Sequence, residues 1–143
     1  MSYNLFLDDV RNPNSFLKDI RTWVVVKDYV QFVNTIKEKG LPKFISFDHD
    51  LSFEHYPLSE GREALSMPTE IPYDKYKYKT GYDCARWIIE YCENNKVSLP
   101  DYQVHSMNPI GKQNIIATLE NFKKHKNAEQ TYIGNDGGST SQR

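Results

Sequence analysis

The sequence predicts a single α/β domain built on a parallel, doubly wound sheet with helices on both faces, and three observations support this fold class. Short apolar and β-branched runs alternate along the chain with stretches of helical periodicity. The length of 143 residues suits one domain with one core. Right-handed crossovers between successive parallel strands then make 2-1-3-4 the simplest strand order.

Four runs of residues have the composition of buried strands, and a fifth is a weaker candidate. The four are residues 4–8, 22–27, 44–48 and 102–106, each rich in apolar or β-branched side chains. Residues 131–133 are the candidate for a fifth strand at the edge, after the fourth. The sheet is therefore expected to have four to five strands, in the order 2-1-3-4 with the fifth beyond the fourth.

Three helices are expected between and after these strands, each with a recognisable start. Asp28, Thr80 and Asn108 are the expected N-caps, and Pro109 suits the first helical position after Asn108. Gly40 ends the first helix, Pro100 follows the second, and the third is expected to run to about residue 124. Residues 12–20 hold at most a short further helix. The expected core positions on the first two helices are Val30, Val33, Ile36, Ala85, Ile88, Ile89 and Cys92.

The chain is expected to divide into a domain of residues 1–134 and a disordered tail of residues 135–143. Within the domain, residues 52–79 form a Tyr-rich insertion much longer than an ordinary connection. Insertions of this kind are commonly lids or binding loops. The tail, which is rich in glycine, serine and threonine, has a composition that buries little apolar surface.

Composition excludes several functions that depend on bulk charge or hydrophobicity. The 18 basic and 19 acidic side chains give a net charge of −1, so long-range attraction does not recruit nucleic acid. No apolar run approaches the roughly 20 residues that span a bilayer, and Met1 is followed by a strand rather than a leader. We therefore expect a cytoplasmic protein without membrane partners. Cys84 and Cys92 are expected to be buried free thiols.

Two acidic clusters follow two strands that the predicted order makes neighbours. Asp8 and Asp9 end the first strand, and Asp48 and Asp50 end the third. Ligands of doubly wound sheets bind beyond the strand ends where the strand order reverses, which is between these two strands. Converging carboxylates repel one another unless a cation compensates, so a divalent metal, Mg²⁺ or Mn²⁺, is the expected cofactor. The alternative is that these aspartates only form turns and caps.

Histidines and a helix start add further chemistry to the same crevice. His49 and His105 follow neighbouring strands, where an imidazole exchanges protons near neutral pH or ligates a metal. A phosphate cradle is expected from Ser106, Asn108 and Lys112 at the start of the third helix, although capping alone also explains Asn108.

The insertion supplies further candidate side chains, and each of them also has a purely structural explanation. His55 is expected to be a solvated loop residue. The tyrosines of the insertion and the helix after it either stack on a base or cover the core. They are Tyr73, Tyr76, Tyr78 and Tyr82.

Four motifs give the chain a resemblance to a known family. They are LFLDDVRNP, FISFDHDLS, TGYDCARWI and VHSMNPIGKQNI. Together they resemble the cyclic-phosphate-processing receiver-like domains of bacteria and phages, over about residues 4–119. The resemblance implies a divergent receiver fold, flavodoxin-like in its sheet, that processes cyclic phosphates on nucleotides or RNA ends. It also implies the matching site positions Asp8, Asp9, Asp48, His49, Asp50, His105 and Ser106.

The chain also resembles signalling receivers, in which a paired acid binds Mg²⁺ and a central aspartate accepts phosphate. It departs from them because the fifth strand, which should present a lysine to the phosphoryl group, is missing or reduced to residues 131–133. Lys112 is not the positional equivalent of that lysine.

Two functional hypotheses follow. The first is a phosphodiesterase that opens a cyclic phosphate on a nucleotide or an RNA end, in a bacterial cell or a phage-infected host, for RNA repair or counter-defence. His49 and His105 would act as base and acid, with Asp48 and Asp9 beside them. The metal would be held by Asp8, Asp9, Asp48 and Asp50. The alternative is a module that binds cyclic nucleotides without cleaving them, or a Mg²⁺-dependent phosphoacceptor.

Overall fold

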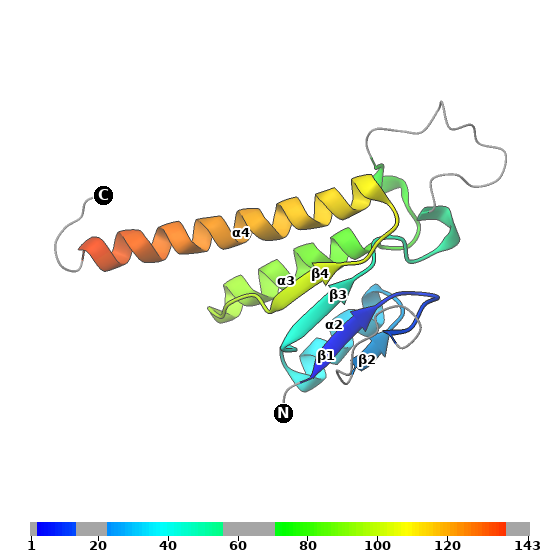
Figure 1. The fold of residues 1–143 in the computed structure, drawn as a ribbon, viewed down its shortest axis with the longest axis horizontal. Helices are drawn as coiled ribbons and strands as arrows, with labels where there is room; N and C mark the ends of the chain where they lie inside the picture. The colour runs from blue at the N-terminus through cyan, green and yellow to red at the C-terminus, as the bar shows by residue number, and fades with distance from the viewer. Residues whose placement is uncertain (1–2, 14–22, 56–70, 137–143) are drawn as a thin grey trace.

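Four short strands form one parallel sheet in the order β2-β1-β3-β4 (Figure 1). The computed structural model describes residues 3–13, 23–55 and 71–136. The strands are β1 (Asn4–Leu7), β2 (Trp23–Val26), β3 (Phe44–Phe47) and β4 (Asp101–Val104). The predicted fold class, the strand order and the four predicted strands are therefore confirmed.

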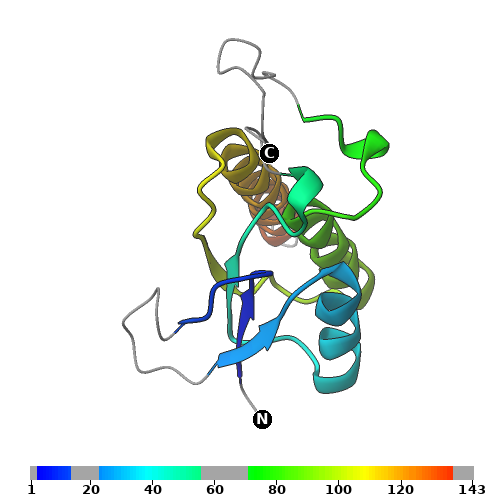
Figure 2. The ribbon, with the colours of Figure 1, turned by 90° about the vertical axis from the view of Figure 1, so that its right-hand side faces the viewer.

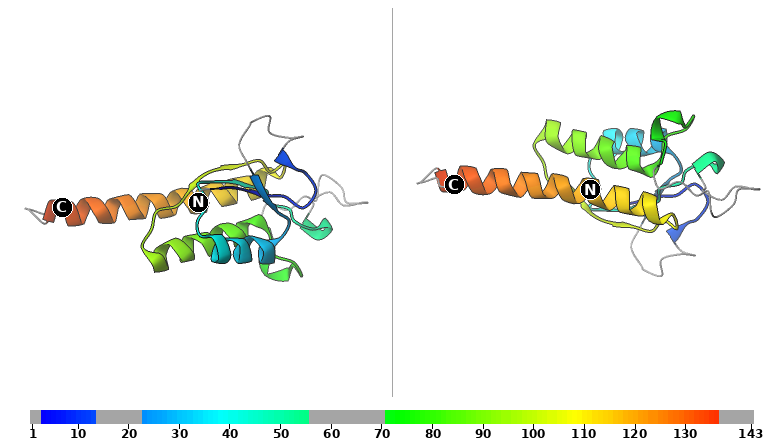
Figure 3. Two further views of the ribbon diagram at one scale, coloured as in Figure 1. Left: turned by 90° about the horizontal axis from the view of Figure 1, so that it is seen from below. Right: turned by 90° about the horizontal axis from the view of Figure 1, so that it is seen from above.

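Helices α2 (Tyr29–Lys39) and α3 (Gly81–Asn95) cover one face of this sheet, as Figure 3 shows. Helix α4 (Pro109–Asp136) packs along α3 and extends well past the sheet (Figure 1). The core lies between the sheet and these helices, where Leu5, Leu7, Ile45 and Phe47 pack with α2, α3 and α4. The short helix considered for residues 12–20 falls largely outside the described residues.

The loops that follow the strands gather at one end of the sheet (Figure 2). They include the short 3-10 helices η1 (Phe53–His55) and η3 (Tyr73–Lys75), which belong to the two ends of the predicted insertion. Residues 56–70 of that insertion are outside the described part of the chain. Parallel strands place their carboxyl ends together, so this end of the sheet is where a site is expected.

Local capping explains where the helices begin and where α2 ends, as the sequence predicted. Asp28 accepts a hydrogen bond from the backbone N–H of Gln31, and Gly40 ends α2 with a φ of 87° that favours glycine. Thr80 and Asp83 form a reciprocal capping box at the start of α3. Asn108 Oδ1 accepts from the Gly111 N–H at 2.9 Å, which caps α4.

Several sequence-based expectations are wrong in the structure. Residues 131–133 belong to α4 rather than to a fifth strand, and α4 ends at Asp136 instead of near residue 124. The reason is that no glycine or proline interrupts the chain between Gly111 and Gly134. Two residues of the expected tail, 135 and 136, are therefore helical, and residues 137–143 lie outside the described part. Val30, expected in the core, is 63% exposed.

Cys84 and Cys92 are buried and unpaired, as predicted. Burial raises the pKa of the Cys92 thiol to about 11, which keeps the thiol protonated and unreactive at neutral pH. Within residues 3–13, 23–55 and 71–136, no helix is long and apolar enough to cross a membrane.

Helix α3 starts directly against the backbone that follows β3, and Gly81 makes this approach possible. Its N–H donates to the carbonyl oxygen of His49 at 2.8 Å, and a Cβ at this position would lie 1.8 Å from the carbonyl oxygen of Asp48. The Gly81→Ala variant is therefore expected to lower the free energy of unfolding by about 2 to 3 kcal/mol, measured by urea denaturation.

A second glycine provides the comparison for this variant. A Cβ on Gly40 would meet nothing within 4 Å, so Gly40→Ala should cost only the strain of a backbone conformation that strongly favours glycine (φ 87°, ψ −179°), about 1 to 3 kcal/mol. A smaller loss of stability in Gly81→Ala than in Gly40→Ala would show that the contact between α3 and the loop after β3 is not tight.

Candidate functional site

Backbone hydrogen bonds carry the ladder of the sheet one residue past each strand and so fix the residues that follow. The Asp8 N–H donates to the Val26 carbonyl at 3.0 Å, and the Asp48 N–H donates to the Leu7 carbonyl at 3.0 Å. The His105 N–H donates to the Phe47 carbonyl at 2.9 Å. Asp8, Asp48 and His105 are therefore positioned by the sheet rather than by flexible loops.

These three residues lie on the same face of the sheet because side chains alternate along a strand. Phe6, Ser46 and Gln103 are paired across β1, β3 and β4 and so share one face of the sheet. Each site residue comes two positions after one of them: Asp8 after Phe6, Asp48 after Ser46 and His105 after Gln103. One ligand atom from each of Asp8, Asp48 and His105 lies within 4.8 Å of the other two, and all three residues are buried. We call Asp8, Asp48 and His105 the acidic cluster.

His105 is held in one orientation by a chain of hydrogen bonds across the sheet. Gln103 Nε2 donates to Ser46 Oγ at 2.9 Å, so the Ser46 hydroxyl is free to donate to His105 Nδ1, 2.7 Å away. His105 Nε2 then donates to Asp8 Oδ2 at 2.9 Å. The imidazole also stacks on Phe6, with ring centroids 4.6 Å apart and an interplanar angle of 4°. The Nε2–H proton therefore points into the acidic cluster.

Asp8 is the carboxylate that the surroundings keep ionised. Its Oδ1 accepts from the N–H groups of Val10 at 2.9 Å and Arg11 at 2.8 Å, and the Arg11 Nε lies 3.3 Å from its Oδ2. Burial acts to raise the pKa of Asp8, but the hydrogen bonds from His105, Arg11 and Val10 outweigh it and leave the pKa lowered.

Asp48 is the carboxyl group that the surroundings make hard to ionise. Burial, followed by the charge of Asp8, raises the pKa of Asp48 to about 7, although its Oδ1 accepts a hydrogen bond from the His49 N–H at 2.8 Å. Arg11, whose charge lowers this pKa, compensates only in part. In the metal-free protein Asp48 is therefore only partly ionised near neutral pH.

The donor set of the acidic cluster suits a divalent cation. Two carboxyl groups converge beside an imidazole ring, and one of them, Asp48, is held back from ionisation by burial and by the charge of the other. A cation between Asp8 and Asp48 would remove that repulsion. Asp9 and Asp50, which the sequence also assigned to the metal, are outside this cluster: Asp9 is partly exposed, and Asp50 is engaged elsewhere.

A second buried network forms around His49 beneath the start of α4. His49 Nδ1 lies 2.7 Å from Asp50 Oδ1, and His49 Nε2 lies 2.9 Å from the hydroxyl of Tyr73. Asn114 Nδ2 donates to the same hydroxyl at 3.0 Å, and Asn108 Nδ2 donates to Asp50 at 3.2 Å. This network ties the end of β3 to α4 and to η3.

His49 is fully buried, and the close approach of Gly111 leaves its ring no room to move. A Cβ at Gly111 would lie 2.4 Å from the His49 ring. Both ring nitrogens of His49 already have partners, and those partners differ from the ones of His105. The two histidines therefore belong to two separate networks rather than to one pair facing a common substrate atom.

The residues predicted to cradle a phosphate are mainly engaged in capping α4. Ser106 Oγ accepts from the Asn108 N–H at 3.0 Å, and Asn108 uses its carbonyl oxygen for Gly111 and its amide for Asp50. Lys112 is exposed one turn into the helix. A phosphate role for Ser106, Asn108 and Lys112 stays a prediction, since capping accounts for the contacts of Ser106 and Asn108.

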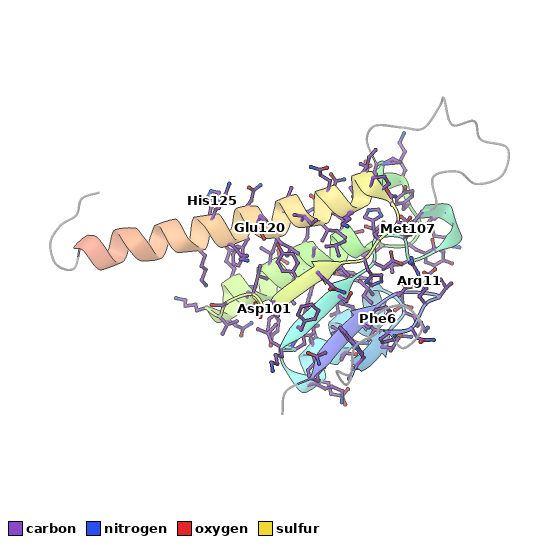
Figure 4. The ribbon with its side chains drawn as sticks, viewed as in Figure 1. Phe6, Arg11, Asp101, Met107, Glu120 and His125 are labelled. Atoms are coloured by element: carbon purple, nitrogen blue, oxygen red, sulfur yellow. The ribbon has the colours of Figure 1, made fainter. Side chains whose placement is uncertain are left out.

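Figure 4 shows Arg11 and Met107 at the carboxyl ends of the strands, the end of the sheet that holds the acidic cluster. Asp101, Glu120 and His125 lie toward the opposite end of the domain. Asp101 and His125 are exposed and so provide controls for changes in the acidic cluster.

A comparison with families of known domains identifies the fold around this site. The family model described as the cyclic-phosphate processing receiver domain matches residues 3–121. The chain belongs to this family. Comparisons with curated proteins and with solved structures gave no match. The matched range of the cyclic-phosphate processing receiver domain runs from β1 into α4 and so includes the acidic cluster and the His49 network.

Several contacts in this cyclic-phosphate processing receiver domain were not anticipated from its sequence. Ser46 and Gln103 orient His105, Arg11 holds Asp8, and Asn114 holds Tyr73. The signal for Ser46 and Gln103 was available, because each precedes a predicted site residue by two positions and so shares its face of the strand. Tyr73 lies outside the motifs and Asn114 lies within the last one, 41 residues further along the chain, and no local pattern pairs them.

Proposed function

We propose that this domain hydrolyses a cyclic phosphate on a nucleotide or at an RNA end. The observation that carries the proposal is the buried acidic cluster of Asp8, Asp48 and His105 at the strand ends of a cyclic-phosphate processing receiver domain. Hydrolysis needs one group that accepts the proton of the attacking water and one that donates a proton to the leaving oxygen. The acidic cluster offers both.

Asp48 and His105 are the residues we assign to the two proton transfers. The water oxygen forms a bond to phosphorus while the ionised form of Asp48 takes the water proton. The bond between phosphorus and the leaving ribose oxygen breaks, and this oxygen takes the Nε2 proton of His105, which points to Asp8. For this step His105 first takes up a second proton at Nδ1 from solvent, so that loss of the Nε2 proton leaves a neutral ring whose Nδ1–H donates to Ser46 Oγ. A pKa of about 7 suits Asp48 to proton transfer near neutral pH.

His49, which the sequence suggested as an acid or base, is assigned a positioning role instead. It lies beneath Gly111 with both ring nitrogens engaged by Asp50 and Tyr73. In this position it holds η3 and the start of α4 over the end of β3. Asp50 supports the same arrangement by accepting from Asn108.

A divalent cation fits the proposal as a cofactor, with Mg²⁺ and Mn²⁺ as the expected metals. Asp8 and Asp48 would hold it, with His105 beside them. When bound, it would neutralise charge on the phosphate oxygens and keep Asp48 ionised. Asp9 lies close enough in sequence to contribute through the loop after β1, but it is outside the acidic cluster.

Turnover of defined substrates tests the proposal. The purified protein is incubated with 2′,3′-cyclic nucleotides, 3′,5′-cyclic nucleotides and an RNA with a 2′,3′-cyclic phosphate end, with Mg²⁺, Mn²⁺ or EDTA. Chromatography should show ring opening to a phosphomonoester for the wild type and for Asp101→Asn, and none for Asp48→Asn. Ring opening at the same rate by Asp48→Asn would exclude the acidic cluster as the active site.

Metal binding should be coupled to proton release from Asp48. Because the pKa of Asp48 is about 7, about half of the molecules carry its proton at pH 7, so each bound ion should release about 0.5 proton. Calorimetric titration with Mn²⁺ in two buffers of different ionisation enthalpy measures this number. Asp101→Asn should release the same amount and Asp48→Asn none. Metal uptake without proton release would place the ion away from Asp48.

A phosphoacceptor function is the second candidate, and the position of Asp48 favours it. Asp48 follows the central strand β3 beside Asp8, as the phosphoacceptor does in signalling receivers. Against it, the described residues contain no fifth strand to present a lysine. Incubation with acetyl phosphate, followed by mass spectrometry, distinguishes the two candidates. Phosphotransfer predicts an added phosphate that alkali removes and that is absent from Asp48→Asn, whereas hydrolysis of a cyclic phosphate predicts no added phosphate.

The biological setting is a prediction from the family resemblance. The substrate would be a cyclic nucleotide or an RNA end in the cytoplasm of a bacterium or of a phage-infected host. RNA repair and removal of a cyclic-nucleotide defence signal both need this reaction.

A further inference from the structure

A hollow of about 660 Å³ opens among the segments that follow β1, β2 and β3, at the same end of the sheet as the acidic cluster, and the chemistry described above does not use it. Asp9, the neighbour of Asp8 in the chain, is part of its lining. The other walls are the start of α2 at residues 27–30, the loop after β3 at residues 51–52 and the segment 77–79 before α3. Its volume falls in the range of about 300 to 1,000 Å³ that is common for small-molecule sites.

Two walls of this hollow are held together by hydrogen bonds through His55, a residue expected to be solvated. His55 is buried, its Nδ1 accepts from the Leu51 N–H at 2.8 Å, and its Nε2 donates to the Tyr78 carbonyl at 2.8 Å. Glu54 Oε2 accepts from the Tyr78 N–H at 2.7 Å. Burial lowers the pKa of His55, which keeps the ring in the neutral form that these bonds require. The hollow is therefore preformed.

The lining combines apolar surface with positive charge. Leu51 is buried in the wall, while Val30 at 63% exposure and Tyr78 at 54% exposure present apolar surface that the core does not use. Lys27, Lys77 and Lys79 also line the hollow, against the carboxylates of Asp9 and Asp28.

The polar lining points to an anionic ligand with a further hydrogen-bonding group. Three lysines line the hollow against two aspartates, so the net charge that faces a ligand is positive, and Asp28 already accepts a hydrogen bond from the Gln31 N–H. The Oγ of Ser52, in the same lining, is buried and has no hydrogen-bond partner. An unsatisfied buried hydroxyl is costly unless a bound group or a water pairs with it.

We propose that this hollow binds the base and the 5′-phosphate of the nucleotide whose cyclic phosphate reacts at the acidic cluster. An aromatic base would pack against Val30, Leu51 and the ring of Tyr78. A 5′-phosphate would pair with the lysines of the lining, and Ser52 would offer a hydrogen bond to the base or the ribose. The proposal rests on the proposed function and adds the substrate class: a nucleotide carrying a second phosphate outside the ring that is opened. That 5′-phosphate is either free or the link to the rest of an RNA.

Binding of non-hydrolysable fragments to the full chain tests this assignment without requiring turnover. The probe is adenosine 3′,5′-bisphosphate, compared by calorimetry with 3′-AMP, which lacks the 5′-phosphate, and with ribose 5-phosphate, which lacks the base. The bisphosphate should bind about ten-fold more tightly than either. An RNA dinucleotide with a 3′-phosphate is added to distinguish a linking phosphate from a free one, and it binds as tightly as the bisphosphate if the RNA end is the ligand.

Variants with exposed side chains locate the binding. The double variant Lys77→Gln/Lys79→Gln should reduce bisphosphate affinity to the level of 3′-AMP, and Tyr78→Ala should weaken both nucleotides but leave ribose 5-phosphate unchanged. The tethers of Tyr78 use its backbone, so this variant retains the wall. Lys37→Gln, in the last turn of α2, removes a charge away from the hollow and should have no effect.

The outcomes distinguish this proposal from the proposed function. Pocket-dependent binding of the bisphosphate without ring opening would support the hollow and refute hydrolysis. Ring opening with an unchanged KM in the lysine and tyrosine variants would support hydrolysis and overturn the hollow as the nucleotide site. No binding of the bisphosphate up to millimolar concentration, or equal affinity in every variant, would also overturn it.

Discussion

Replacing Asp48 with asparagine is expected to stabilise the metal-free protein at pH 8 by on the order of 4 kcal/mol. Burial and the charge of Asp8 raise the pKa of Asp48 from 3.8 to about 7, so ionisation of this carboxyl group opposes folding. Asparagine does not ionise, and it retains an oxygen for the His49 N–H. The function proposed for Asp48 thus carries a cost in stability.

The pH dependence gives the sign of this effect. A raised folded-state pKa contributes stability below pH 3.8, and that stability is lost as the pH rises through about 7. The wild type should therefore lose stability relative to Asp48→Asn between about pH 4 and 7, and the two should be equally stable near pH 3. Urea denaturation in EDTA measures the difference, with Asp101→Asn as the control. A destabilised Asp48→Asn at pH 8 would mean that the carboxylate is compensated in the folded protein.

The His105→Gln variant is expected to lower kcat for ring opening by about 1,000-fold, within the range of about 10² to 10⁴ for loss of a general acid. Glutamine retains an N–H donor for Asp8 but cannot give up a proton to a leaving oxygen. The fold should survive, because His105 also acts through hydrogen bonds that an amide can replace in part. Steady-state kinetics with a 2′,3′-cyclic nucleotide measure the change.

His125→Gln provides the matched comparison, since His125 is exposed on α4 and lies away from the strand ends (Figure 4). Its kcat should equal that of the wild type. If His105→Gln changes KM but leaves kcat intact, His105 contributes to binding and the proton donor must be sought elsewhere. A loss of kcat in both variants would indicate that the assay reports on folding.

The fold could be predicted well from the sequence because its signals are local. The strand runs end in polar residues, the N-caps Asp28, Thr80 and Asn108 precede helical periodicity, and the order 2-1-3-4 follows from right-handed crossovers. The predicted end of α4 was wrong because the prediction relied on local propensity. Residues 131–133 have β propensity, but they lie in a run without a helix breaker and continue α4.

The site could be predicted only in part. Asp8, Asp48 and His105 follow their strands directly, so the strand pattern alone places them together. Asp50 and His49 follow the same strand, but hydrogen bonds with residues of α4 and η3 draw them into another network. Which residue joins which network depends on contacts between distant segments.

The hollow could not be predicted from the sequence, because its walls come from segments that are far apart along the chain. Helical spacing made Val30 a core residue, but the segment that faces it comes from the far end of the insertion, at residues 77–79. His55 was expected to be solvated because its partner Tyr78 is 23 residues away along the chain. A long insertion that returns to the sheet creates such contacts without a sequence pattern.

The most direct test of the central claim follows the oxygen that attacks phosphorus. The protein is incubated with adenosine 2′,3′-cyclic phosphate in water enriched in ¹⁸O, and the product is analysed by mass spectrometry. The account predicts an adenosine monophosphate that carries one ¹⁸O atom on phosphorus for the wild type and Asp101→Asn, and no product for Asp48→Asn. Recovery of intact, unlabelled cyclic phosphate from the wild type with Mg²⁺ and with Mn²⁺ would contradict it.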